Sequence, residues 1–432
     1  MKRFRNSRNG SICTKYFLTL TSFDFYMRIA LINSEYPSPT HSGHGGIATY
    51  TYLAANTLAS LGHTVYILVR EGTSPDPISD SVHIYNYGFS PAPGLHRITD
   101  KFRSGKIVWE RGNSRNIRNT LLSIHKRFGL DIAEFPDYNG LSYQCSGSLP
   151  FPVVVNFHTP SEIVDRLNNL TLTKERSRWH NFEREAIRRA DGYRCPSIAL
   201  RDLVTRDFSI RTDSIEIIRN PVSTDLFDRI NKSHKNDRID LLFAGRLEFR
   251  KGALILLRSL KKILQLNEHI NVTFAGETEL GDAYSYRQAI ERTLSEAERK
   301  RVWFLGPLPS KKLAALYCRS SGFLFPSLFE NSPYSLFEAI SAQLPVIASS
   351  TGGVSEIIRH NETGLLFSPE SIDELLGCIK KFIENRQFCE EMAQRAYQEI
   401  KTEFSPEKIA AESISFYQSL IDKFRDGRKK SR

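Results

Sequence analysis

The feature that most constrains the fold of this chain is an alternation of short apolar runs with amphipathic stretches of ten or more residues, starting at Met27. A short apolar run suits a strand buried on both faces, and an amphipathic stretch suits a helix packed on such a sheet. The alternation predicts a mostly parallel sheet with helices on both faces. We expect a helix at 46–61 and strands at 27–33, 64–69, 82–87, 131–135, 153–158 and 192–196.

The alternation restarts after Asn220-Pro221, where a polar stretch at 220–235 predicts a linker that acts as a hinge. We expect helices at about 252–266 and 406–423, and strands at 240–245, 272–275, 302–305, 323–326 and 345–348. The sequence therefore predicts two facing, doubly wound Rossmann-like domains. Such domains bind ligands at the carboxyl ends of their strands, so the pair should form one cleft that holds two substrates. The predicted boundaries are 27–219 for the N-terminal domain, 220–405 for the C-terminal domain, and 406–432 for a C-terminal helix and basic tail.

The net charge of +11 lies mostly near the two ends of the 432-residue sequence. Residues 1–26 carry five Lys or Arg against one Asp, and residues 421–432 carry six against two Asp, which leaves +3 for the rest. A nearly balanced body without interleaved basic and aromatic residues disfavours nucleic acid as a partner. We expect 1–26 to be a disordered extension, or sequence upstream of a start at Met27.

Cysteine spacing and hydropathy bear on the cellular compartment. The six cysteines are scattered without a C-x-x-C pair, and no apolar run reaches 18 residues. Scattered cysteines in a chain of this size favour reduced thiols and a cytoplasmic protein. The sequence contains neither a metal-ligand spacing nor a D-x-D motif, so we expect no metal and no other cofactor.

The most informative motif is Glu330-Asn-Ser-Pro-Tyr-Ser-Leu-Phe-Glu338, which follows an apolar run. Pro333 suits the first turn of a helix, because that position needs no N–H donor. The unpaired N–H groups of Tyr334, Ser335 and Leu336 would lie at the positive end of the helix dipole, which suits a diphosphate. The two carboxylates could accept hydrogen bonds from hydroxyl groups. The alternative is one surface Glu and one helix-face Glu with no shared task.

A second motif, Phe243-Ala-Gly-Arg246-Leu-Glu-Phe-Arg-Lys251-Gly252, predicts a strand, a glycine turn and a helix start. Arg246 offers a planar fork to phosphate, and Lys251 offers a compact charge. Two cations aimed at one diphosphate would stabilise the charge that develops as it leaves. The alternative is a solvated basic turn.

A third segment, residues 41–47, joins the first strand to the first helix. Gly45 and Gly46 would let the backbone approach a ligand closely and present N–H groups at the helix start. The segment lacks the G-x-G-x-x-G spacing of a dinucleotide site. A plain tight turn is the alternative.

Together these motifs resemble the retaining GT-B glycosyltransferases, in particular glycosyltransferase family 4. The resemblance covers roughly residues 27–417 and is most specific at 245–252 and 323–367. Within 323–367, Glu330 and Glu338 match the E-x7-E motif of the family. They are followed in the family's order and spacing by Leu344-Pro-Val-Ile, Gly352-Gly353-Val354-x-Glu356 and Gly364-Leu-Leu-Phe.

The resemblance implies roles for four catalytic residues. Arg246 and Lys251 would hold the donor diphosphate, and Glu330 would contact the hydroxyls of the transferred sugar. His158, in Val-Val-Asn-Phe-His-Thr-Pro, would line the sugar pocket near the reacting carbon. From the sequence alone, a hydrogen-bonded histidine at a strand end is the simpler interpretation of His158.

The resemblance also implies a set of donor-binding residues. Glu338 would bind ribose hydroxyls. The backbone N–H groups of Gly45, Gly46, Ser335 and Leu336 would meet phosphate, and the carboxylate of Glu277 would cap the base pocket. The sequence departs from the family at Pro333-Tyr334-Ser335, where Phe-Gly-Leu is common. Tyr334 could narrow the sugar pocket, which leaves the identity of the sugar open.

The activity implied is transfer of a sugar, with retention, from a UDP-, GDP- or ADP-sugar to a glycan, lipid-linked or small-molecule acceptor, in cell-surface polysaccharide or glycoconjugate synthesis. A retaining glycosidase needs a nucleophilic carboxylate about 5 Å from an acid. We find no convincing candidate nucleophile near His158. The hypothesis is therefore that the acceptor hydroxyl attacks from the leaving-group face and that the departing phosphate takes its proton.

Three alternatives remain at this stage. The first is a phosphorylase or a sucrose- or trehalose-type synthase of the same fold, and the second is a non-catalytic sugar-nucleotide-binding protein. The third is a nucleic-acid binder, which the charge distribution disfavours. On the acceptor side, residues 101–130 carry a local charge of +7. That stretch suits peripheral contact with an anionic lipid at the inner membrane face, or a phosphorylated acceptor, and equally a solvated helix face.

Overall fold

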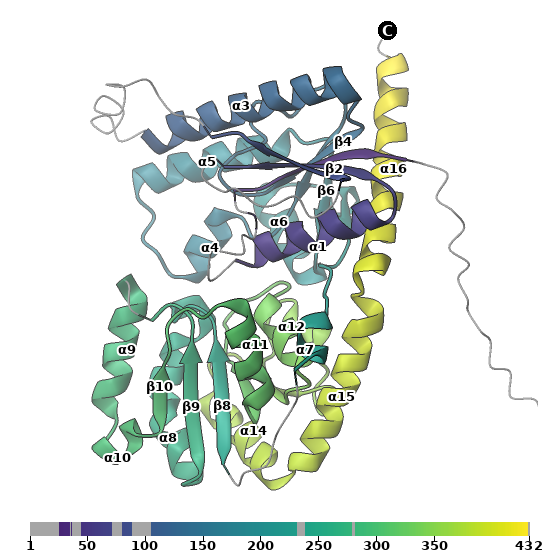
Figure 1. The fold of residues 1–432 in the computed structure, drawn as a ribbon. Helices are drawn as coiled ribbons and strands as arrows, with labels where there is room; N and C mark the ends of the chain where they lie inside the picture. The colour runs from purple at the N-terminus through teal and green to yellow at the C-terminus, as the bar shows by residue number, and fades with distance from the viewer. Residues whose placement is uncertain are drawn as a thin grey trace, which may run out of the picture.

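The computed structural model describes residues 26–34, 36, 45–70, 80–88, 105–230, 238–278 and 281–430 (Figure 1). The expected extension at 1–26, apart from Tyr26, and most of the 41–47 turn lie outside these residues. The first domain is built on a seven-stranded parallel sheet in the order β3-β2-β1-β4-β5-β6-β7. Its strands are β1 (Arg28–Ile32), β2 (Thr64–Val69), β3 (Val82–Asn86), β4 (Ile132–Pro136), β5 (Val153–Asn156), β6 (Gly192–Cys195) and β7 (Ile215–Ile217).

The second domain is built on a six-stranded parallel sheet in the order β10-β9-β8-β11-β12-β13. Its strands are β8 (Ile239–Ala244), β9 (Ile270–Ala275), β10 (Val302–Phe304), β11 (Gly322–Phe325), β12 (Val346–Ser349) and β13 (Leu365–Phe367). In both sheets the order reverses beside the first strand, and such a switch point is where open α/β sheets bind ligands.

Helices cover both faces of each sheet (Figure 1). Those of the first domain are α1 (Gly46–Ser60), α3 (Gly105–Phe128), α4 (Ser161–Leu167), α5 (Lys174–Arg188) and α6 (Ile198–Phe208). Those that follow are α7 (Asp225–Asp228), α8 (Ala253–Leu266), α9 (Gly281–Thr293), α10 (Glu296–Arg299), α11 (Ser310–Arg319), α12 (Tyr334–Ser341), α13 (Val354–Ile357), α14 (Ile372–Glu384), α15 (Arg386–Glu403) and α16 (Pro406–Lys430). Short 3₁₀ helices span Thr212–Ser214 and Phe249–Lys251.

The last helix, α16, packs on the first domain although it follows the second in sequence (Figure 1). Ile414, Tyr417 and Ile421 are buried in one cluster with residues of β1 and β2. The helix continues to Lys430, seven residues past the expected end, so most of the expected basic tail is helical. No helix within the described residues is long and apolar enough to cross a bilayer.

The chain passes between the domains twice, and the two crossings lie side by side. Val222 donates its N–H to the carbonyl of Phe404 at 2.8 Å, which joins the first crossing to the second. Asn220 is buried at the same place. The hinge expected at Asn220 therefore consists of two backbone segments that are hydrogen-bonded to each other.

Candidate active site

The basic turn after β8 is held against the end of β11 by one glycine. Gly252 has φ of 86°, and a Cβ at that position would lie 2.1 Å from the carbonyl oxygen of Pro326. Leu328 donates its N–H to the carbonyl of Arg250 at 2.7 Å. Only glycine fits this close approach and this backbone angle. The two sequence motifs are thereby joined through their backbones.

Glu330 lies between two cations of that turn. Its Oε1 is 2.5 Å from Nζ of Lys251 and 2.8 Å from Nη1 of Arg250, and the residue is 7% exposed. Burial alone would raise the pKa of Glu330, but Lys251 and then Arg250 outweigh it and hold the pKa below its ordinary value. Glu330 is therefore ionised at neutral pH and keeps both cations in place.

Arg246, the other predicted diphosphate ligand, is linked to this cluster through Glu248. The side chain of Arg246 is 68% exposed and its Nη1 is 3.5 Å from Glu248, which also pairs with Arg250 at 2.9 Å. Arg250, the second partner of Glu330, was not predicted from the sequence. The adjacent letters Arg250-Lys251 were a signal for it, but the 3₁₀ turn at 249–251 is what lets both side chains face Glu330.

Helix α12 places Glu338 as expected, but one predicted phosphate donor is already paired. Pro333 is the N-cap, not a residue of the first turn. Leu336 donates its N–H to the carbonyl of Pro333 at 3.1 Å, so the expectation of an unpaired Leu336 N–H was wrong. The helix starts tightly, with an i to i+3 hydrogen bond that satisfies this donor internally. The carbonyl of Ser335 accepts from the hydroxyl of Tyr317 at 3.1 Å.

Glu338 lies one turn into α12 and is partly buried. Burial raises its pKa to about 7, against a smaller lowering by the Tyr317 hydroxyl. A carboxylate in this position lacks enough donors to be stable as an anion. Hydroxyl groups of a bound ligand would supply those donors.

His158 follows β5, and its backbone is fixed from both domains. Its N–H donates to Oδ2 of Asp137 at 3.0 Å, and its carbonyl accepts from the amide of Asn331 in the second domain. The imidazole packs edge-on to Tyr50 with ring centroids 5.3 Å apart. Burial lowers the pKa of His158 to about 4, a shift that Glu134 opposes, so the ring is neutral at pH 7.

The remaining predicted donor residues lie at strand and helix ends. Gly45 is the N-cap of α1 and is exposed, and Gly46 packs on Tyr334 of the second domain. The carbonyl of Glu277, after β9, accepts from the N–H of Leu247 at 3.1 Å. Tyr334 does not stand alone in a pocket, because its hydroxyl donates to the carbonyl of Pro221 in the hinge at 3.1 Å.

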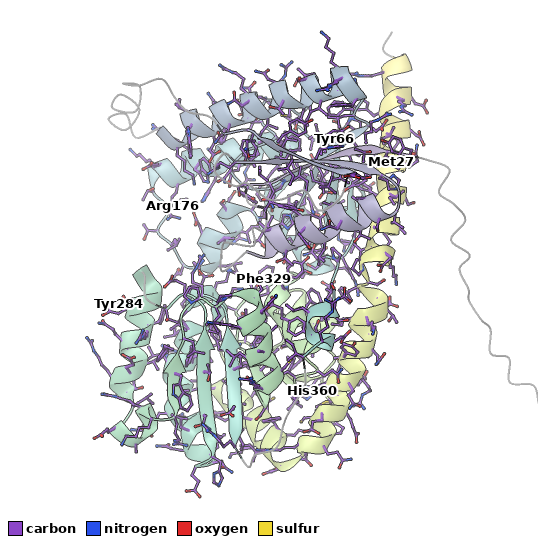
Figure 2. All side chains as sticks on the ribbon, in the orientation of Figure 1. Met27, Tyr66, Arg176, Tyr284, Phe329 and His360 are labelled. Atoms are coloured by element: carbon purple, nitrogen blue, oxygen red, sulfur yellow. The ribbon has the colours of Figure 1, made fainter. Side chains whose placement is uncertain are left out.

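The structure thus brings Lys251 and Glu330 into direct contact and links His158 to the residue after Glu330. Figure 2 labels Phe329, the neighbour of Glu330, at the edge of the second domain that faces the first. Glu356 makes a further contact across this boundary, where its carboxylate accepts the N–H groups of Ile198 and Ala199 at 3.1 and 2.9 Å. The carboxyl ends of the two sheets are therefore in contact.

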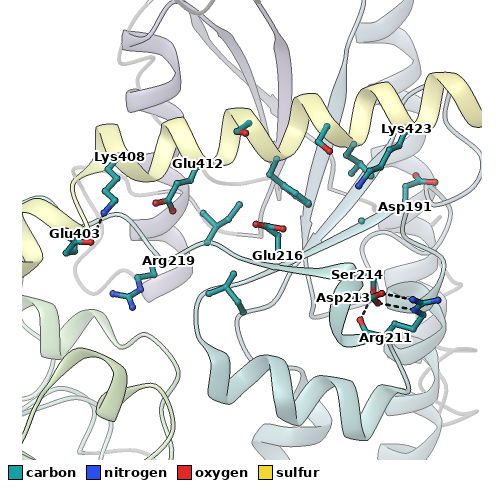
Figure 3. A pocket seen from close by; sticks show the side chains of 17 residues that line it. Asp191, Arg211, Asp213, Ser214, Glu216, Arg219, Glu403, Lys408, Glu412 and Lys423 are labelled. Atoms are coloured by element: carbon teal, nitrogen blue, oxygen red, sulfur yellow. Dashed lines mark hydrogen bonds and ion pairs between the residues drawn. The ribbon is translucent and has the colours of Figure 1, made fainter. Parts of the chain in front are cut away.

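A separate hollow of about 910 Å³ lies between β7 and α16 and contains none of these residues (Figure 3). Four of its charged groups form two ion pairs, in which Arg211 bonds Asp213 at 2.5 Å and Lys408 bonds Glu403 at 2.6 Å. Within the residues that the structure describes, no group of three or more His, Cys, Asp or Glu side chains could hold a metal ion.

Two family models match adjacent parts of the sequence. Residues 44–226 match the model described as "Glycosyltransferase Family 4", and residues 226–399 match "Glycosyl transferases group 1". Together they span 44–399, a range that includes every predicted site residue. The chain belongs to glycosyltransferase family 4. It is accordingly an enzyme of the glycosyltransferase class.

Similar proteins span nearly the whole of this glycosyltransferase. Glycogen synthase of Mycobacterium tuberculosis is 24% identical over 90% of this chain and 94% of its own length. An MMP α-(1→4)-mannosyltransferase of Mycolicibacterium hassiacum is 21% identical over 91% and 98%. Both names describe glycosyl transfer, with different products.

Solved structures confirm the GT-B fold of two facing Rossmann-like domains. Sucrose-phosphate synthase from Thermosynechococcus elongatus superposes with a TM-score of 0.70 at 19% identity, over 92% of this chain and 99% of its own. HepE from Anabaena, solved with UDP and glucose, gives 0.65 at 16% identity, over 91% and 100%.

Proposed function

We propose that this glycosyltransferase takes its sugar from a nucleotide-diphosphate donor and transfers it, with retention and without a metal, to a hydroxyl of a glycan, a lipid-linked sugar or a small molecule. The observation that carries the proposal is the 2.5 Å contact between Lys251 and Glu330. The contact pairs a lysine, whose charge suits a phosphate, with a carboxylate, which suits hydroxyl groups, at the boundary between the domains. HepE of Anabaena, solved with UDP and glucose, has the same fold.

The donor diphosphate lies between Arg246 and Lys251 in this proposal. The exposed guanidinium of Arg246 is available to an anion, and Lys251 is aimed by Glu330. The N–H of Ser335 and the Gly45–Gly46 turn, at the starts of α12 and α1, add positive helix-dipole ends. These groups balance the charge of the leaving phosphate in place of a metal ion.

The hydroxyl groups of the donor meet the two carboxylates. Glu330 accepts from the transferred sugar with the oxygen that its cations leave available, and Glu338 accepts from the ribose. Donation from ribose hydroxyls would stabilise the anionic form of Glu338, whose pKa is about 7 without them. Glu277 faces the base in this arrangement.

The acceptor hydroxyl attacks from the side of the leaving phosphate, which takes its proton. We do not assign the nucleophile of a double displacement to the buried carboxylates around His158, because Glu134 is held by four donors and Asp137 supports the His158–Thr159 backbone through one oxygen. Glu134 accepts from Tyr50, Asn156, Arg194 and Tyr417, and Asp137 accepts from the backbone of residues 158 and 159. His158 contributes a neutral ring beside the reacting carbon.

The outer face of α3 is the proposed region of contact with an anionic lipid or a phosphorylated acceptor. Arg115, Lys126 and Arg127 are exposed along this helix. Lys106 and Arg111 are exposed too and lie over the rings of Trp179 and Tyr143, as Arg127 lies over the ring of Phe128. Binding of the enzyme to anionic vesicles, compared with neutral ones, measures this contact.

The test of the donor is thermal stability and turnover with a panel of UDP-, GDP- and ADP-sugars in the presence of a chelator. A donor at 100 times its Kd should stabilise the folded enzyme by about 2.7 kcal/mol. The matched control is the double variant Arg246→Ala/Lys251→Ala, which should lose the stabilisation. A complete lack of response to every donor, or activity abolished by the chelator, would contradict the proposal.

A further inference from the structure

Asn331 connects the two halves of the site through its side chain. Its amide Nδ2 donates to the carbonyl of His158 and, at 3.1 Å, to Oγ1 of Thr159. Its Oδ1 accepts the N–H of Ser332, which fixes the orientation of the amide. Asn331 is 8% exposed, so these bonds are formed away from solvent.

The His158–Thr159 turn needs such support, because its backbone is strained. Thr159 has φ of 147°, a region that residues with a side chain rarely adopt. Asp137 holds the turn from the first domain, accepting the N–H groups of His158 and Thr159 at 3.0 Å each. Asn331 holds it from the second. The turn is therefore shaped by one residue from each domain.

Asn331 is in turn fixed to Glu330. Gly353 donates its N–H to the carbonyl of Glu330 at 2.8 Å. A Cβ on Gly353 would lie 1.8 Å from the carbonyl oxygen of Asn331, so the absence of a side chain permits this packing. Glu330 itself holds Lys251 and Arg250. A continuous set of contacts thus runs from the cations to the histidine.

We propose that Asn331 is a positioning residue, which sets the His158 ring relative to the Glu330–Lys251 pair when the two domains are in contact. This role rests on the proposed function for its effect on catalysis, but the placement of His158 can be measured without a substrate. Asn331 acts through His158 and has no role in holding the nucleotide. Its loss should therefore lower kcat and leave nucleotide affinity unchanged.

The kinetic test compares Asn331→Ala with Asn331→Asp. Misplacement of a reacting group by about 1 Å can cost about 10²-fold in rate, so we expect kcat of Asn331→Ala to fall by about that factor, with the Kd for the nucleotide within about threefold of wild type. In Asn331→Asp the new carboxyl group, when protonated, regains one donor toward the His158 carbonyl, whereas its ionised form repels that carbonyl. The rate of Asn331→Asp relative to wild type should thus rise as the pH falls from 8 to 6. Asp137 and Glu330 face the same turn and titrate in both proteins, and the His158 titration of Asn331→Asp is followed separately by NMR so that its contribution to the ratio is known.

The substrate-free test follows the His158 imidazole by NMR, with His158→Gln to identify its signal. In the wild type the ring should stay neutral to about pH 4, and in Asn331→Ala its pKa should move toward 6.5. Glu356→Gln weakens another contact between the domains without touching this turn, and should leave the titration as in wild type. If Asn331→Ala does not fold, Thr159→Val takes its place in this test. It removes one acceptor of the Asn331 amide and should shift the His158 pKa by less, in the same direction.

Either of two results would overturn the inference: an unchanged His158 titration in Asn331→Ala, or the same shift in Glu356→Gln. An inactive wild type would contradict the proposed function instead, while the NMR comparison would still decide the role of Asn331.

Discussion

Gly46 of the first domain lies against the ring of Tyr334 of the second, and a Cβ on Gly46 would be 3.2 Å from Cδ2 of that ring. Each residue is the first of its helix, α1 and α12, so two helix N-termini from opposite domains meet here. The ring cannot retreat freely, because its hydroxyl is bonded to Pro221 in the hinge. This contact therefore limits what can stand at position 46.

The first prediction concerns Gly46→Ala. The added methyl group must displace the Tyr334 ring by a few tenths of an ångström, which separates the two helix starts. We expect kcat/KM for the donor to fall by about threefold to tenfold, with little change in Tm. The control is Gly377→Ala in α14, where the structure leaves open space around the new Cβ. That variant should keep full activity and gain up to about 1 kcal/mol of stability. Equal activity of the two variants would contradict the expectation.

Tyr334→Phe removes the hydrogen bond to the Pro221 carbonyl while keeping the ring. The buried carbonyl loses its partner, so the free energy of unfolding should fall by about 1–2 kcal/mol. Urea denaturation monitored by circular dichroism measures this. Tyr52→Phe, an exposed tyrosine on α1, is the matched control and should change the free energy of unfolding by less than about 0.5 kcal/mol.

Lys251→Ala should act on the chemical step. The lysine balances charge that develops on the leaving phosphate, so we expect kcat to fall by about 10²- to 10³-fold. Steady-state kinetics with the donor found in the panel separates kcat from KM. A rise in KM with an unchanged kcat would contradict this role. Arg250→Ala provides a contrast, because it leaves Lys251 as the sole cation on Glu330, and its effect on kcat should be smaller.

The protonation of Glu338 predicts a pH dependence of stability without ligand. Its pKa is raised to about 7 in the folded state, so folding favours the proton-bound form. The folded state therefore loses stability relative to the unfolded state as the pH rises from about 4.5 to about 7. Glu338→Gln removes this titration and should become more stable than wild type, by about 1–2 kcal/mol, between pH 5 and pH 8.

The measurement is the difference in free energy of unfolding between the two proteins at each pH, since Asp137 and Glu183, whose pKa values are also raised, titrate in both. A difference that stays constant with pH would refute the assignment. Nucleoside diphosphate binding to wild type should strengthen over the same pH range by more than binding to Glu338→Gln, in which the ionisation of the ligand's own phosphate is left.

The ion pair between Glu134 and Arg194 predicts a strongly asymmetric mutational response. Arg194 is 1% exposed, and its Nη1 lies 3.3 Å from Oε2 of Glu134. Glu134→Leu leaves a buried, uncompensated guanidinium and should cost about 3–5 kcal/mol of stability. The double variant Glu134→Leu/Arg194→Met should cost clearly less than Glu134→Leu alone. Urea denaturation of the wild type, Glu134→Leu and the double variant measures the free energy of unfolding of each. A double variant that loses as much stability as Glu134→Leu, or more, would contradict this interpretation.

Sequence periodicity predicted the strands well where both faces of a strand are buried. Thr64–Val69 was predicted to the residue, and its pattern is an almost continuous apolar run. Three edge strands have only three residues each: β10 was predicted from 302–305, whereas β7 and β13 were missed. The long helix α3 was not assigned, since its exposed face is crowded with charge.

The candidate site was predictable where the spacing of residues along one element determines which of them lie together. Glu330 and Glu338 belong to one strand–helix unit, and Lys251 follows a glycine turn of recognisable length. Asn331 could not be predicted, because its partners lie about 170 residues away in the other domain. The pairing of the Leu336 N–H depended on how tightly the first turn of α12 winds, which the sequence pattern does not specify.

The position of α16 has a consequence for biosynthesis. Residues 409–421 complete the core of a domain whose strands begin at Arg28, so that core contains the earliest and the latest segments of the described chain. A ribosome makes these segments hundreds of residues apart. The second domain has all its strands before α16 emerges, and can fold first. Until α16 emerges, α1 covers the apolar face of β1 and β2 only in part, and the surface that α16 will bury stays exposed, which makes the first domain the more aggregation-prone half during translation.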